Sequence, residues 1–193
     1  DVYSYTDLML FSDKLMRQNK FDGFFIDPYN SLKIQMSAGS AISTHEYHYE
    51  AASEFLTYAK RNNIAVWLNT HAVTEAQRRR DGEGQPVAPF AEDTEGGGKF
   101  VNRADGFLTI HRKIQHPEPH VRRTTELHVR KVREVETGGE PTPYGEPVYF
   151  EMNASATGFR PIVGQNLFRP MAYEAFDQPK INFEINSDIL NAF

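Results

Sequence analysis

A strand–helix–strand pattern across residues 21–68 constrains the fold more than any other feature of the sequence. Residues 21–26 form a short apolar run that stops at Asp27, and such a run predicts a strand buried on both faces, as in a parallel sheet. A capping box at residues 43–46 predicts the start of a helix that runs to about residue 61, and residues 64–68 form a second apolar run. Strand, helix and strand in this order predict one βαβ unit with a right-handed crossover.

The flanking segments extend this pattern in two different ways. Apolar residues at helical spacing predict a helix at about residues 6–18, with Thr6 as its N-cap. Residues 74–93 lack apolar periodicity and predict a long mobile loop. Beyond it we expect a short helix and strands at residues 106–112, 125–132 and 148–152, the later ones antiparallel. Residues 1–160 should therefore be one α/β domain, and 161–193 an extension of unknown role, with a short strand at 181–183 and a short helix near Asp188.

Composition limits the classes of protein that fit. The chain has 193 residues, a net charge of −5 and no cysteine, which removes a disulfide framework, a thiolate metal site and a cysteine nucleophile. No apolar run approaches the ~20 residues of a membrane span, so we expect no membrane partner and a cytoplasmic protein. The chain begins with Asp1 rather than Met, as expected of a piece of a longer protein. The histidines lack the spacing of a metal-binding motif.

Polar side chains follow both predicted strands of the βαβ unit. Asp27 ends the first strand, and Asn69, Thr70 and His71 end the second. Ligands of α/β sheets bind at the carboxyl ends of the strands, where a carboxylate can hold Mg²⁺ and an Asn or His can face a phosphate. The alternative is that these residues only cap the turns that follow the strands.

Two groups of basic residues are candidates for binding phosphate. Lys131 and Arg133 alternate along a predicted strand, so both should lie on one face, where they could bind a polyphosphate together. Residues 78–80 are three arginines in the predicted loop, which could bind a nucleic-acid backbone without reading its sequence. A solvated basic edge and a solvated basic run are the respective alternatives.

Taken in order, these segments resemble the RecA-like core of DnaB-type replicative helicases and of the related phage or plasmid primase-helicases. Residues 24–30 (FFIDPYN) resemble the Walker B strand of that family, and residues 66–71 (VWLNTH) resemble the next motif. Residues 94–105 (TEGGGKFVNRAD) resemble the segment that ends in Ala-Asp before a strand, and residues 131–133 (KVR) resemble the K-x-R motif. The match covers about residues 6–153, and it depends on the order and spacing of the motifs.

The resemblance implies an α/β, RecA-like fold with a mostly parallel, twisted sheet flanked by helices and antiparallel strands in the C-terminal half. It implies ATP and Mg²⁺ as cofactors, with Asp27 holding the metal, Asn69 at the nucleotide and His71 sensing the γ-phosphate. Lys131 and Arg133 would complete the ATP site of a neighbouring subunit, with Arg133 as arginine finger, in a ring or filament that is a hexamer in the complete protein. Single-stranded DNA would be contacted by Arg78, Arg79, Arg80 and Lys99.

The sequence departs from the family pattern in one respect that affects activity. It contains no G-x-x-x-x-G-K-[ST], and the Gly-Gly-Gly-Lys at residues 96–99 is followed by Phe100 where a Ser or Thr should bind magnesium. Truncation explains the missing motif, and we then expect ATPase and helicase activity of the complete protein but not of these residues alone. The alternatives are another RecA-like ATPase, of recombinase or signalling type, and a non-catalytic interaction module.

Overall fold

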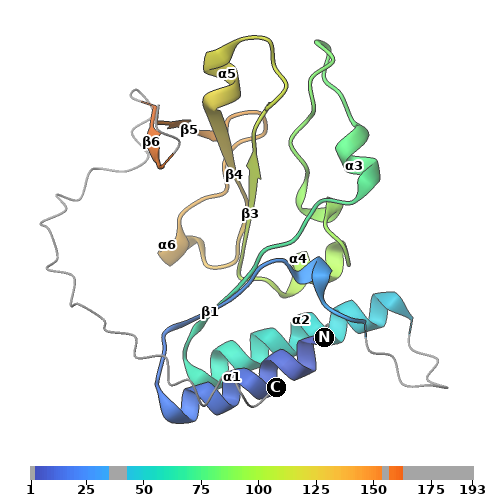
Figure 1. Cartoon of the computed structure of the whole chain (residues 1–193), viewed down its shortest axis with the longest axis vertical. Helices are drawn as coiled ribbons and strands as arrows, with labels where there is room; N and C mark the ends of the chain where they lie inside the picture. Colours follow the sequence, from blue (N-terminus) through green and yellow to red (C-terminus); the bar gives the residue numbers. More distant parts are fainter. Residues whose placement is uncertain (1–2, 35–42, 154–156, 163–193) are drawn as a thin grey trace, which may run out of the picture. The chain divides into compact units, whose positions relative to one another are not determined.

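The computed structural model describes residues 3–34, 43–153 and 157–162. Residues Asp1–Ile162 form one compact unit (Figure 1). The strand at 181–183 and the helix near Asp188 that we expected lie outside the described residues. None of the helices within the described ranges combines the length and apolar character needed to cross a membrane.

The predicted βαβ unit is confirmed. Strand β1 (Gly23–Ile26) leads through the 3₁₀ turn η1 (Tyr29–Ser31) to helix α2 (Thr44–Asn62) and strand β2 (Ala65–Leu68). The two strands pair in parallel, and Phe25 lies opposite Trp67. Helix α1 (Tyr5–Gln18) precedes the unit.

The second half of the unit is built on an antiparallel sheet of four strands in the order β3-β4-β5-β6. The mostly parallel sheet that we expected is therefore wrong for the described residues, in which only β1 and β2 are parallel and form a sheet of their own. The elements that follow β2 are α3 (Thr74–Arg78), η2 (Ala91–Asp93), α4 (Gly98–Arg103), β3 (Gly106–His111), α5 (Pro119–Arg123), β4 (Thr124–Val132), α6 (Val135–Gly138), β5 (Val148–Met152) and β6 (Phe159–Pro161).

Side-chain caps set the ends of the two long helices. Helix α2 begins at the predicted capping box, in which the Ser43 hydroxyl accepts from the backbone N–H of Glu46. Helix α1 begins at Ser4 and not at the predicted Thr6, because Ser4 and Asp7 form a second capping box that satisfies the first free N–H groups.

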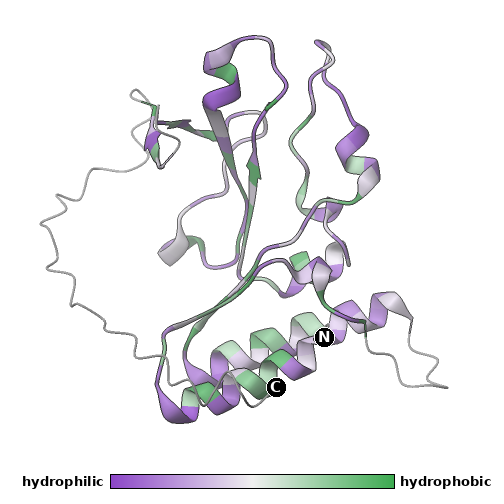
Figure 2. Cartoon of the chain, in the orientation of Figure 1, coloured by the Kyte–Doolittle hydropathy of each residue, from purple (hydrophilic) through white to green (hydrophobic). Residues whose placement is uncertain are grey.

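The core lies where α2 packs against β1 and α4. Ala51 and Phe55 of α2 are buried with Ile26 of β1, Tyr29 and Phe100. Small residues on α2 allow this close approach, and apolar side chains of α1 pack at the edge of the cluster. Figure 2 shows hydrophobic residues alternating with hydrophilic ones along α1 and α2, as expected of helices with one buried side.

One face of the parallel sheet is open. Phe25 is 62 % exposed and Trp67 is 53 % exposed, and both belong to the same pair across β1 and β2. The expectation that the β1 strand is buried on both faces is therefore wrong within the described residues. Only the face of Ile26 packs into the core.

Residues 74–93 contain more structure than their sequence pattern predicts. They include α3, a bridge between Arg80 and Pro86, and η2. Lys113 Nζ lies 3.0 Å from a carboxylate oxygen of Asp81, and a ring nitrogen of His111 lies 3.1 Å from the Pro86 carbonyl oxygen. These contacts fasten the segment to the end of β3, and its mobility stays a prediction.

Candidate nucleotide site at the strand ends

Asp27 and Asn69 meet at the carboxyl ends of β1 and β2. Because Ile26 lies opposite Leu68 in the parallel register, the next residue of each strand leaves the sheet at the same edge. The side-chain amide of Asn69 donates to Oδ1 of Asp27 at 2.6 Å. The backbone N–H of Asn69 donates to the Ile26 carbonyl at 2.9 Å, which continues the ladder by one residue.

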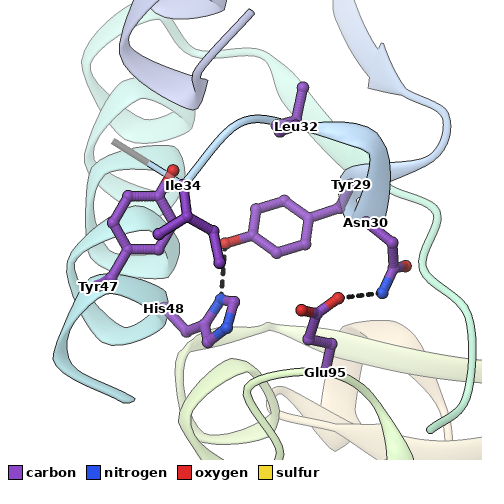
Figure 3. Close-up of a pocket in the computed structure, with 7 residues that line it drawn as sticks. All are labelled: Tyr29, Asn30, Leu32, Ile34, Tyr47, His48 and Glu95. Carbon is purple, nitrogen blue, oxygen red and sulfur yellow. Dashed lines mark hydrogen bonds between the residues drawn. The ribbon is translucent and has the colours of Figure 1, made fainter. Parts of the chain in front are cut away.

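Asn30 joins the loop after β1 to the loop after β2. Its side-chain oxygen accepts from the Thr70 hydroxyl at 2.8 Å and from the backbone N–H of His71 at 2.7 Å. Its amide nitrogen donates to Glu95, as Figure 3 shows. The backbone of His71 is thus fixed, and its side chain is exposed.

Sequence reasoning did not identify Asn30 or Glu95 as site residues. Asn30 stands at the end of the quoted FFIDPYN segment, so its place after the strand was a usable signal. Glu95 had none, because its contact with Asn30 joins residues 65 positions apart.

A small buried cavity lies behind this loop (Figure 3). Its volume is about 40 Å³, and its lining includes Tyr29, Asn30, His48 and Glu95. The Tyr29 hydroxyl lies 2.8 Å from Nδ1 of His48, and burial lowers the pKa of His48. A space of this size holds about one water molecule, so it is no nucleotide pocket. Asp27 and His71 do not line it.

Asp27 fits the part of a magnesium ligand. It is exposed, and no described Lys, Arg or His forms an ion pair with it. The described residues contain no cluster of three metal-ligating side chains. Mg²⁺ in nucleotide sites commonly takes one or two carboxylates and completes its shell with phosphate oxygens and water, so a single Asp is compatible with it.

Lys131 and Arg133 lie together at the C-terminal end of α4. Lys131 Nζ contacts the Val101 carbonyl, and a guanidinium nitrogen of Arg133 contacts the carbonyls of Asn102 and Arg103 at 3.0 Å. Arg133 also forms an ion pair with Asp105 at 2.6 Å. Cations at the end of a helix satisfy its last carbonyls and oppose the negative end of its dipole. Both side chains therefore already have partners within the chain.

The predicted DNA-contacting residues do not lie in one environment. Arg78 is exposed, with Glu75 at 3.9 Å. Arg79 forms an ion pair with Asp93, and Arg80 donates to carbonyls of its own segment. Lys99 is exposed on α4, with Nζ 5.6 Å from the centre of the Tyr49 ring.

The glycine-rich segment before α4 does not form a phosphate cradle. The backbone N–H groups of Gly97, Lys99 and Phe100 donate to carbonyls of residues 94–97 and are not directed at an open site. Gly96 has a φ of +80°, and a Cβ there would lie 2.7 Å from the Phe100 ring. This glycine therefore serves the packing of Phe100 and not an anion.

Comparison with known proteins identifies the fold. No family model matches the sequence, and no curated protein matches it. The structure is similar to a solved ATPase domain of the DnaB-like replicative helicase type, with a TM-score of 0.64 and 15 % identity over 83 % of this chain and 52 % of that one. It is also similar to a DnaB-like replicative helicase solved in a study of its interactions with primase, with a TM-score of 0.61 and 15 % identity over 79 % of this chain and 33 % of that one. The chain has the fold of DnaB-like helicase ATPase domains and spans about half of the first of these structures.

Proposed function

We propose that this chain is part of the motor domain of an ATP-dependent DNA helicase of the replicative or primase-helicase type. The observation that carries the proposal is the pairing of Asp27 with Asn69 at adjacent parallel strand ends, beside the anchored backbone of His71. The likeness to two helicase ATPase structures over about four fifths of the chain supports it.

In this proposal the strand ends face the phosphates of ATP. Asp27 supplies a carboxylate to Mg²⁺, which neutralises charge on the phosphates. Asn69 holds the Asp27 carboxylate in one orientation through its 2.6 Å hydrogen bond. His71 extends from a fixed backbone toward the γ-phosphate, and its loop leads directly into α3 and the arginines at residues 78–80.

Lys131 and Arg133 would act on the ATP of a neighbouring copy in a ring or filament. Their contacts with α4 and Asp105 hold both cations side by side. A phosphate would compete with the Asp105 carboxylate for Arg133, because both bind a guanidinium through paired oxygens. The DNA would be single-stranded, with Arg78 and Lys99 the exposed candidates for phosphate contacts.

The first test is ATP turnover by the complete protein that contains these residues. Asp27→Ala should lower turnover by more than about 100-fold, beyond the loss typical of a group that only orients a metal ligand. Asp22→Ala is the matched control, because Asp22 is exposed at the opposite end of β1 and uses only its backbone carbonyl in pairing. Unchanged turnover in Asp27→Ala would exclude the proposed site.

Two further outcomes separate the competing functions. Unwinding of forked DNA by the complete protein distinguishes a helicase from a recombinase or a signalling ATPase. The absence of a G-x-x-x-x-G-K-[ST] motif from these 193 residues favours a non-catalytic module as the second candidate. Complete loss of ATP binding and turnover in the unmodified full-length protein would favour that second candidate.

A further inference from the structure

An aromatic stack joins the 74–93 segment to the turn that precedes β5. The rings of Phe90 and Tyr144 lie 6.0 Å apart at 14°, which is a parallel stack. Tyr144 is 82 % exposed, more than any other large hydrophobic residue in the described ranges. One face of its ring is therefore supported by Phe90, and the other side is open to solvent.

Two guanidinium groups flank the same stack. The Arg79 and Arg130 Cζ atoms lie 5.0 and 5.2 Å from the centre of the Phe90 ring, within the range of cation–π attraction. Asp93 neutralises Arg79 through an ion pair. Arg130 forms no ion pair with any carboxylate of the described residues, although Glu92, Asp93 and Glu126 act on it at longer range.

The backbone directs Arg130 toward the stack. The register of β3 and β4 shifts so that Phe107 pairs with Lys131 and Leu108 with Val129, which leaves Arg130 without a partner residue on β3. Such irregularities re-aim side chains and are frequent beside functional sites. A guanidinium nitrogen of Arg130 donates to the Pro89 carbonyl at 2.8 Å, which holds the cation beside Phe90.

We propose that Tyr144, backed by Phe90, is a base-stacking platform for single-stranded nucleic acid, and that Arg130 contacts the adjacent phosphate. A ring stacked on one side loses little freedom when a base covers its other side, and every base offers a π-face. An arginine without a carboxylate partner, held next to the platform, supplies the counter-charge that a nucleotide needs. The identity of the ligand rests on the proposed function, whereas the location rests on the stack itself.

The local charge favours a binding mode dominated by stacking. Arg79 is already paired, and acidic residues at 92 and 93 lie nearby, so the patch is not strongly basic. Loss of the ring should therefore weaken binding without altering its dependence on salt. Loss of Arg130 should instead lower the salt dependence by about one phosphate contact.

The test is fluorescence anisotropy of the 193-residue chain with a labelled oligo(dT) of about 16 nucleotides, the upper end of the site sizes of single-strand-binding folds. Tyr144→Ala should raise Kd by about 5- to 150-fold with an unchanged salt slope. Tyr144→Trp should retain binding. Phe159→Ala, which removes another exposed aromatic side chain from β6, should bind like the unmodified chain.

Several outcomes would overturn the platform. These are failure of the unmodified chain to bind oligo(dT), equal affinity of Tyr144→Ala, and an equal effect of Phe159→Ala. Thermal unfolding of Tyr144→Ala verifies that the exposed ring is not needed for the fold. If Tyr144→Ala changes the oligomeric mass in sedimentation but not oligo(dT) affinity, the ring packs on a second copy instead. ATP turnover and its loss in Asp27→Ala are independent of these readouts, so the platform can fail while the proposed function stands.

Discussion

At the scale of single residues, Asn30 holds the strand-end site together. Its amide accepts two hydrogen bonds from the loop after β2 and donates one to Glu95. An Asn side chain supplies both a donor and an acceptor in a fixed plane, which neither Asp nor Ala can reproduce. Asp27 could be predicted because it follows an apolar strand, whereas the role of Asn30 depends on partners that only the fold brings near.

Replacement of Asn30 by Asp tests this arrangement. Asn30→Asp removes the donor to Glu95 and places two carboxylates against each other, so we expect a loss of about 1–3 kcal/mol in the free energy of unfolding. Adding Glu95→Gln restores a donor opposite the new carboxylate and should recover most of the loss. Urea unfolding of the two single variants and the double variant measures the coupling. A double variant as unstable as the sum of the singles would contradict it.

At the scale of elements, a single buried hydrogen bond joins α1 to α2. The hydroxyls of Ser12 and Tyr58 lie 2.6 Å apart, and their residues are 0 % and 1 % exposed. Buried hydroxyls that lose their partner cost more than the bond contributes, so this pair fixes the relative position of the helices. The rest of the contact is apolar packing, which tolerates small shifts more readily.

A double-mutant cycle measures the contribution of this pair. Tyr58→Phe should lower the free energy of unfolding by about 1–3 kcal/mol, because the Ser12 hydroxyl is left buried without its partner. Adding Ser12→Ala removes that hydroxyl and should cost less than its effect in the unmodified chain. Guanidinium chloride unfolding of the four proteins gives the coupling energy. Additive losses would show that the hydroxyls do not act as a pair.

Local signals account for the elements that were predicted, and long-range contacts account for those that were not. The βαβ unit follows from two apolar runs and a capping box, all readable within a few residues. The four-residue apolar strands give no alternation, so the exposure of Phe25 and Trp67 could not be foreseen. The structure of residues 74–93 depends on partners such as Lys113 and Arg130, which lie far along the chain.

At the scale of the whole molecule, two buried histidines make stability depend on pH. Burial lowers the pKa of His48 and of His128, with Glu95 and Glu126 opposing the shift in each case. Nδ1 of His128 is buried and has no hydrogen-bond partner among the described residues. Both rings are therefore held neutral inside the fold.

The sign of the pH effect follows from these lowered pKa values. The unfolded chain binds protons at its histidines near pH 6.5, before the folded chain does, so stability is complete above about pH 6.5 and falls as the pH drops through the folded pKa. Guanidinium chloride midpoints at about pH 7.5 and about pH 5.5 should show this loss, on either side of that reference value.

Substitution of His128 identifies the source of the effect. His128→Gln should reduce the difference between the two midpoints, and His120→Gln is the matched control at an exposed histidine. A pH dependence that is identical in His128→Gln and the unmodified chain would exclude His128 as a contributor.

The open face of the parallel sheet has an optical consequence. Trp67 is the single tryptophan of the chain, and it lies half exposed in the strand that leads to Asn69 and His71. Its indole fluorescence therefore comes from one known position, two residues before the strand-end site. Any segment or partner that covers this face must exclude water from the indole and shift its emission to shorter wavelength. The protein thus contains a built-in reporter for whatever binds beside β1 and β2.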